Sequence, residues 1–226
     1  MKPDVDWQPS LLDGGEPAPD ASFGGLIRLH LDQHSWVDHC PGWLSGSDDV
    51  FATLSQEARW QQRTVHMYDK QVREPRLTAG WSTDAADATT PAVLREVAAA
   101  LSSRYPVAFD RIWVNLYRDG ADSVAWHGDR NRLVMTCPLV ATVSLGARRR
   151  FLLRRRGTTT ATHRLELGHG DLVVMGGRCQ SEWEHTVPKT TQPVGPRMSV
   201  TIRHSRPAPG ERWLREPSSG EPGHAL

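Results

Sequence analysis

Residues 113–129 read Trp-Val-Asn-Leu-Tyr-Arg-Asp-Gly-Ala-Asp-Ser-Val-Ala-Trp-His-Gly-Asp and end in a His-x-Asp pair, His127 and Asp129. Side chains two positions apart on a strand point the same way, so this pair can reach one metal ion together. A further histidine, His185, lies in a later strand-like segment. Two imidazoles and one carboxylate form the facial triad that binds non-haem Fe(II) and leaves coordination positions open. We therefore predict that His127, Asp129 and His185 bind a metal.

A second His-x-Asp tripeptide, His169-Gly170-Asp171, could compete for this role. It lies between Gly168 and the apolar run 172–175, which is typical of a turn that leads into a buried strand. In such a turn an aspartate accepts hydrogen bonds from nearby backbone amides. We therefore interpret the second tripeptide as structural and favour the first as the ligand pair.

The segment 197–203 alternates strictly between polar and apolar residues, which places Arg197 and Arg203 on one face of a strand. Two buried arginines would be costly unless they met anions, and a dicarboxylate would satisfy both. The same parity places Asn115 and Tyr117 on one face of their strand, where an amide and a phenol can bind the same dicarboxylate. The alternative is an edge strand whose arginines face solvent.

The composition is that of a single domain with 226 residues, 38% hydrophobic residues and a net charge of +1. No apolar run approaches the roughly 18 residues of a membrane span, and no secretory signal is visible at the N-terminus. The three cysteines are far apart, which indicates free thiols in a reducing compartment, so we expect a cytoplasmic protein. Six arginines within residues 148–156 could contact phosphates or form a solvated hairpin.

The order of predicted elements indicates an α+β protein. Residues 1–25 are rich in Pro, Gly and Asp and are expected to form a flexible arm, and residues 206–226 a disordered tail. Two helices, near 47–60 and 91–105, precede a strand-rich half, and the polar stretch 61–90 is expected to be an irregular, functional loop. Short strands separated by Gly or Pro favour a double-sheet jelly roll over residues 26–205. The predicted strands are 26–31, 111–117, 123–127, 139–145, 150–153, 163–167, 172–175, 183–187 and 197–204.

Taken together, these motifs resemble the AlkB family of Fe(II)- and 2-oxoglutarate-dependent nucleic-acid dealkylases over roughly residues 68–204. The matching segments are Pro75-Arg76-Leu77-Thr78-Ala79, Asn115-Leu116-Tyr117-Arg118, His127-x-Asp129, Val143-Ser144-Leu145-Gly146-Ala147, His169-Gly170-Asp171-Leu172, His185-x-Val187-Pro188-Lys189 and Arg197-x5-Arg203. The resemblance implies a double-stranded β-helix core with Fe(II) on His127, Asp129 and His185. It also implies that Asn115, Tyr117, Arg197 and Arg203 hold 2-oxoglutarate, with Arg197 on the distal carboxylate. The implied reaction uses O2 to dealkylate N-alkylated bases of DNA or RNA, and it releases formaldehyde, succinate and CO2.

A base inside a duplex cannot reach a buried metal, so the expected substrate is single-stranded or carries a flipped base. The resemblance places a nucleotide-recognition lid at 61–90. There we predict stacking by Trp81, with Tyr68 behind it, and a phosphate contact by Arg76, although both aromatics could equally be ordinary packing residues. Asn131 could read a base edge, but it cannot supply the negative charge that many relatives place after the His-x-Asp. We expect the protein to be a monomer. Two alternative functions remain open: a hydroxylase of a small molecule or protein side chain, and a non-enzymatic nucleic-acid-binding jelly roll.

Overall fold

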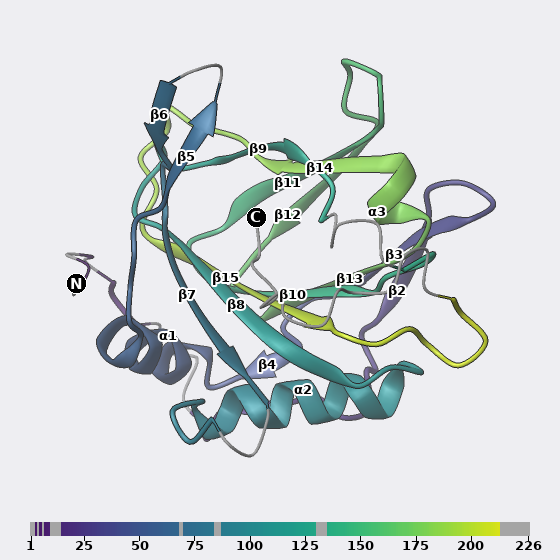
Figure 1. Ribbon diagram of the computed structural model, residues 1–226. Coiled ribbons are helices and arrows are strands. Elements are labelled where there is room, and N and C mark those ends of the chain that lie inside the picture. The colour runs from purple at the N-terminus through teal and green to yellow at the C-terminus, as the bar shows by residue number, and fades with distance from the viewer. Residues whose placement is uncertain are drawn as a thin grey trace.

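Two antiparallel sheets face each other in the computed structural model, which describes residues 3, 5, 7–9, 15–67, 70–83, 87–129 and 135–212 (Figure 1). The larger sheet has seven strands in the order β2-β3-β13-β10-β15-β8-β7. Their bounds are β2 Ile27–His30, β3 Ser35–Cys40, β7 Leu77–Ser82, β8 Phe109–Tyr117, β10 Val140–Gly146, β13 Asp171–Gly177 and β15 Arg197–His204. The smaller sheet has the order β12-β11-β14-β9. Its strands are β9 Val124–His127, β11 Arg149–Arg155, β12 His163–Leu167 and β14 Trp183–Val187. This pair of facing sheets is the predicted jelly roll.

Two helices, α1 (Ser47–Glu57) and α2 (Ala92–Arg104), cover the outer face of the larger sheet (Figure 1). Helix α2 buries an apolar stripe of Leu94, Val97, Ala98 and Leu101 in the core beneath that sheet. The helix ends at Arg104 because Pro106 restricts the preceding residue to extended backbone. A short helix, α3 (Cys179–Glu182), leads directly into β14. No helix in the described parts of the chain has the length and apolar character needed to cross a bilayer.

Strand parity separates the two faces of the larger sheet. On β15, Met198, Val200 and Ile202 belong to the core between the sheet and the helices. The intervening polar residues of β15 therefore point into the space between the two sheets. Part of that space is filled by a second apolar core that includes Phe151, Leu153, Val173 and Trp183. The rest is lined by polar side chains, and this is where the candidate site lies.

The stretch 61–90 is more regular than its polar composition suggested. It contains a hairpin, β5 (Thr64–Met67) with β6 (Lys70–Arg73), followed by strand β7 of the larger sheet. The expectation of an irregular loop was therefore wrong for about half of this stretch, the residues of β5, β6 and β7. Polar residues are tolerated here because β7 is an edge strand and β5–β6 is a separate two-stranded sheet. The hairpin rises above the larger sheet, on the side where β9 and β14 lie (Figure 1).

The described ends of the chain are packed more closely than expected. Strand β1 (Ala18–Pro19) pairs with β4 (Leu44–Ser45), and Phe23 is buried, so residues 15–25 are not a flexible arm. Trp7 donates a hydrogen bond to Asp48 over 2.8 Å. Aromatic side chains supply the apolar burial that the Pro- and Gly-rich composition concealed. Within the expected tail, Glu211 accepts a hydrogen bond from Thr136, while residues 213–226 lie outside the described residues.

Strand β3 was not expected, because its sequence, Ser-Trp-Val-Asp-His-Cys, mixes polar and apolar residues. Its central carboxylate is buried but satisfied. Asp38 accepts hydrogen bonds from Arg28 over 2.6 and 2.8 Å and from the Tyr105 hydroxyl over 2.8 Å. A buried carboxylate with these partners is compatible with a core strand, but local sequence does not reveal the partners.

Candidate metal and cosubstrate site

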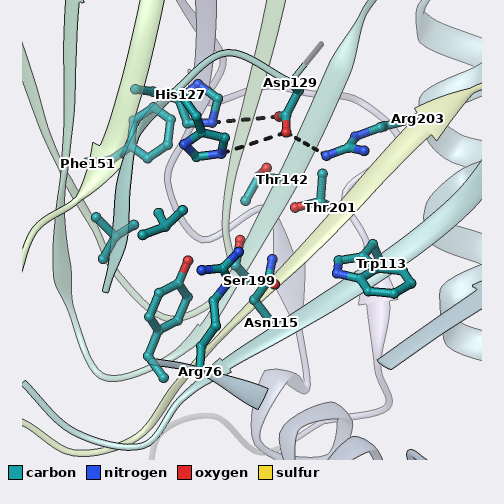
Figure 2. Close-up of a pocket in the computed structure, with 14 residues that line it drawn as sticks. Arg76, Trp113, Asn115, His127, Asp129, Thr142, Phe151, Ser199, Thr201 and Arg203 are labelled. Carbon is teal, nitrogen blue, oxygen red and sulfur yellow. Dashed lines mark hydrogen bonds and ion pairs between the residues drawn. The ribbon is translucent and has the colours of Figure 1, made fainter. Parts of the chain in front are cut away.

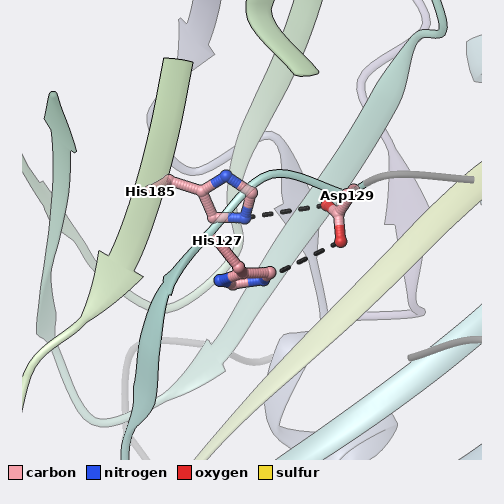
Figure 3. A group of neighbouring side chains, drawn as sticks. All are labelled: His127, Asp129 and His185. Atoms are coloured by element: carbon pink, nitrogen blue, oxygen red, sulfur yellow. Dashed lines mark ion pairs between the residues drawn. The ribbon is translucent and has the colours of Figure 1, made fainter. Parts of the chain in front are cut away.

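The smaller sheet brings the three predicted metal ligands together (Figure 3). His127 ends β9 and is the register partner of His185 on β14, so both rings leave the sheet on the same side. Their centroids are 4.2 Å apart. Asp129 follows β9 and places its carboxylate oxygens 3.8 Å from Nε2 of His127 and 3.6 Å from Nε2 of His185. One potential ligand atom from each residue lies within 4.8 Å of the other two.

Neighbouring groups orient both imidazoles. Nδ1 of His127 lies 2.8 Å from the carbonyl oxygen of Ala125, which directs Nε2 toward the carboxylate. The His185 ring stacks on Phe151, with 5.2 Å between centroids. Such support fixes the tautomer and direction of a ligand before the metal arrives.

The electrostatics of the site favour the ligating forms. Burial alone would raise the pKa of Asp129, but Arg203 and the two imidazoles hold it at about 2. Burial, together with repulsion from His127, lowers the pKa of His185 to about 3. At neutral pH the carboxylate is therefore ionised and the His185 imidazole is neutral, as metal binding requires.

The metal-free protein should lose stability on acidification, because His185 is held neutral in the fold. Its folded pKa of about 3 lies below the ordinary 6.5, so the unfolded chain binds more protons between these values. The contribution of His185 to the free energy of unfolding is then fully present above about pH 6.5, and it falls by about 2 kcal/mol by pH 5. Urea unfolding of chelator-treated protein should show this loss, and His185→Asn should remove most of it. Equal pH dependence in the two proteins would contradict the assignment.

Arg197 and Arg203 present unsatisfied donors in the space between the sheets. Arg197 is 1% exposed and donates through Nε to Ser144 over 3.0 Å. Burial lowers its pKa to about 10, so it remains charged at neutral pH. Nη1 of Arg197 and Nε of Arg203 are both buried without a hydrogen-bond partner. Buried cations with spare donors indicate a site for an anion with two negative ends.

Polar side chains line the pocket beside the triad, where Arg203 donates to the carboxylate of Asp129 over 2.5 Å (Figure 2). Asn115 is the register partner of Ser199, and Trp113 is the register partner of Thr201, so all four face the pocket. The pocket is lined by Arg76, Trp113, Asn115, Tyr117, Val124, His127, Asp129, Thr142, Phe151, His185, Val187, Ser199, Thr201 and Arg203. The structure thus brings Asn115, Tyr117 and Arg203 into one pocket with the triad, while Arg197 lies behind it, 5.4 Å from the Tyr117 ring.

Arg76 lies inside this pocket, contrary to the phosphate contact we expected from it. It donates to the side-chain oxygen of Asn115 over 3.1 Å and to Glu74 over 3.1 Å. A guanidinium with these partners on a side chain that is only 12% exposed is poorly placed to meet a phosphate backbone. Because the Asn115 oxygen is engaged by Arg76, its amide nitrogen is left to donate to a carboxylate.

Trp81 does not face the pocket. It is the register partner of Ile112 and packs against the core on the helix side of the larger sheet. Trp113 occupies the pocket instead, and the guanidinium of Arg63 lies over its ring at 4.4 Å. Gly80 gives Trp113 its room, because a Cβ there would lie 2.6 Å from the ring. Trp113 lies two positions before Asn115 on β8, so strand alternation could have identified it as a pocket residue from sequence. The predicted roles of Tyr68 and Asn131 fall outside the described residues.

The duplicate tripeptide has the structural role predicted for it. Asp171 accepts hydrogen bonds from the backbone amides of Gly42 and Gly168 over 2.9 and 2.8 Å. His169 accepts one from the amide of Gly146 over 2.7 Å. These contacts join the turn before β13 to neighbouring loops.

The arginine cluster at 148–156 is largely engaged within the protein. Arg149 is buried and donates to the carbonyl oxygens of Asp119, Asp122 and Pro188. Arg154 and Arg156 both pair with Glu184. These pairings favour a structural role for this part of the cluster over phosphate binding.

Comparison with known proteins defines the class of the chain. A family model described as the 2OG-Fe(II) oxygenase superfamily matches residues 37–203. Among solved structures, OsALKBH1 superposes with a TM-score of 0.56 at 14% identity, covering 79% of this chain and 100% of that one. A facing pair of sheets with a His-Asp-His group between them fits this class.

Sequence relatives narrow the class. The "Alpha-ketoglutarate-dependent dioxygenase alkB homolog 3" of Bos taurus is 33% identical, covering 77% of this chain and 68% of that protein. The "DNA oxidative demethylase ALKBH2" of Mus musculus is 28% identical over 88% of this chain and 96% of its own length. The chain belongs to the AlkB family of Fe(II)- and 2-oxoglutarate-dependent dioxygenases.

The enzyme therefore uses Fe(II), 2-oxoglutarate and O2, and the donor set fits these groups. His127, Asp129 and His185 would hold the iron, which supplies oxidising chemistry when O2 and 2-oxoglutarate are bound. The chain's own contribution is to fix the metal ligands and to present paired cations to a dicarboxylate.

Proposed function

We propose that this enzyme removes alkyl groups from N-alkylated bases of DNA or RNA, releasing formaldehyde. The observation that carries the proposal is the pocket, where the triad and the cosubstrate donors share one space with the aromatic ring of Trp113. The names of relatives that include a DNA oxidative demethylase support the same substrate class.

The substrate base enters single-stranded or flipped out of a duplex. Support comes from the depth of the metal site, since Asp129 and His185 are almost wholly buried and only His127 is substantially exposed. A base still in its stack could not bring an alkyl group to such a site. We assign base stacking to Trp113, and the guanidinium of Arg63 lies over its ring at 4.4 Å.

Trp113→Leu should raise KM for a methylated oligonucleotide about tenfold or more, because stacking on an aromatic ring contributes about 1–3 kcal/mol per base. Steady-state kinetics with the oligonucleotide as the varied substrate measures this effect. Trp81→Leu is the matched control on the opposite face of the sheet, and its KM should stay near that of the wild type. If KM rose for Trp81→Leu and stayed unchanged for Trp113→Leu, base stacking would be assigned to Trp81, as the sequence predicted.

A panel of oligonucleotides, each with one different N-methylated base, tests the proposed function. DNA and RNA versions, single-stranded and duplex, are incubated with Fe(II), 2-oxoglutarate and O2 and analysed by mass. We expect loss of the methyl group from at least one member, with single strands preferred over perfect duplexes. A panel without any demethylated product would refute the proposal. The monomeric state and the cytoplasmic location stay predictions.

A further inference from the structure

Helix α3 carries a buried polar side chain, Gln180, that contacts the backbone of the metal ligand Asp129. Gln180 is 3% exposed, and its side-chain oxygen accepts a hydrogen bond from the backbone amide of Asp129 over 2.8 Å. Its amide nitrogen lies 3.6 Å from the sulfur of Met175, a weak acceptor. The strong contact of this buried amide is therefore the one with the metal-ligand segment.

The backbone at Gly128, the residue before Asp129, lies in close contact with α3. A Cβ on Gly128 would lie 2.6 Å from the carbonyl oxygen of Gln180 and 2.8 Å from a guanidinium nitrogen of Arg156. Arg156 in turn donates to the carbonyl oxygen of Ser181 over 2.9 Å. Only a glycine fits at position 128 with this spacing, so Gly128 and Gln180 together bring Asp129 close to the helix.

Asp129 needs such a contact because it lies beyond the last residue of β9. Strand pairing therefore does not hold its backbone, whereas His127 and His185 are held by the pairing of β9 with β14. Helix α3 runs directly into β14, so a bond from Gln180 to Asp129 ties the carboxylate ligand to the strand that carries His185.

We propose that Gln180 is a positioning residue for the metal, which fixes the backbone of Asp129 so that its carboxylate meets the two imidazoles. Groups that orient metal ligands typically change metal affinity about 10–100-fold when they are removed. The role concerns metal binding alone and does not depend on which substrate the enzyme oxidises.

Gln180→Met keeps the length of the side chain and removes its amide oxygen. We expect Mn(II), an oxygen-inert probe for the Fe(II) site, to bind this variant about 10–100-fold more weakly, as measured by calorimetry or electron paramagnetic resonance. The matched control is Cys179→Ala, a buried neighbour in the same helix that packs in the core between the sheets. Its Mn(II) affinity should stay within about twofold of wild type, because the Gln180 contact is intact.

Gly128→Ala tests the same contact from the other side, and it serves if Gln180→Met does not fold. The added methyl group should push Asp129 from α3 and weaken Mn(II) binding as well. Because both changes break one contact, the double variant should bind only slightly more weakly than the worse single variant. The proposal is overturned if Gln180→Met binds Mn(II) like wild type, if Cys179→Ala loses as much affinity, or if the two losses multiply.

Discussion

Replacing Asp129 by alanine should abolish 2-oxoglutarate turnover, whereas replacing Asp171 should leave it intact. The two aspartates end identical His-Gly-Asp tripeptides, but only Asp129 lies within reach of two imidazoles. Loss of a group that merely orients a metal ligand costs about 10–100-fold, so loss of the ligand itself should exceed this. Succinate formation measured in the presence of Fe(II), 2-oxoglutarate and O2 reports the effect.

Asp171→Ala controls for damage to the fold. It leaves the backbone amides of Gly42 and Gly168 without their acceptor, which should cost about 1–3 kcal/mol for each buried donor that stays unsatisfied. We therefore expect a lower Tm with Mn(II) affinity preserved. An Asp129→Ala protein that still forms succinate, or an Asp171→Ala protein that folds but binds no Mn(II), would contradict this assignment of the two tripeptides.

Arg197→Met should weaken 2-oxoglutarate binding roughly 30- to 5000-fold, which corresponds to about 2–5 kcal/mol for removing one partner of a buried charge pair. The same change should barely destabilise, or even stabilise, the cosubstrate-free protein, because it removes a buried cation whose Nη1 has no partner. Thermal unfolding with and without 2-oxoglutarate measures both effects.

Arg149→Met provides the matched control, since Arg149 is also a buried arginine near Tyr117. Its donors are engaged by three backbone carbonyl oxygens, so its loss should lower Tm while leaving 2-oxoglutarate affinity nearly unchanged. If Arg149→Met and Arg197→Met behaved alike, Arg197 would be a structural residue.

The side chains expected to bind 2-oxoglutarate could be predicted from sequence, because the alternation of side chains along a strand is a local property. Alternation along 197–203 and 113–117 fixes which side chains share a face, and the structure places Asn115 and Arg203 in one pocket. The local sequence does not reveal that β9 pairs with β14. His185 was predicted because a facial triad needs a second imidazole from a distant strand, and the resemblance to a known family implied the same ligand set.

The substrate side was less predictable, because it depends on the register between distant strands. Pairing of Trp81 with Ile112 turns that indole toward the helices, and a shift of one residue would have turned it toward the metal. Arg76 and Gln180 were also unpredictable in role. Their partners, Asn115 and Asp129, lie 39 and 51 residues away along the chain.

Coupling between 2-oxoglutarate oxidation and base repair tests the central claim most directly. Formaldehyde, succinate and demethylated oligonucleotide should be measured in the same reaction, for wild type and for Asp129→Ala. We predict equal amounts of all three from the wild type and none from the variant. Succinate formed by the wild type without formaldehyde or any change in the oligonucleotide, across all methylated bases tried, would contradict a nucleic-acid dealkylase.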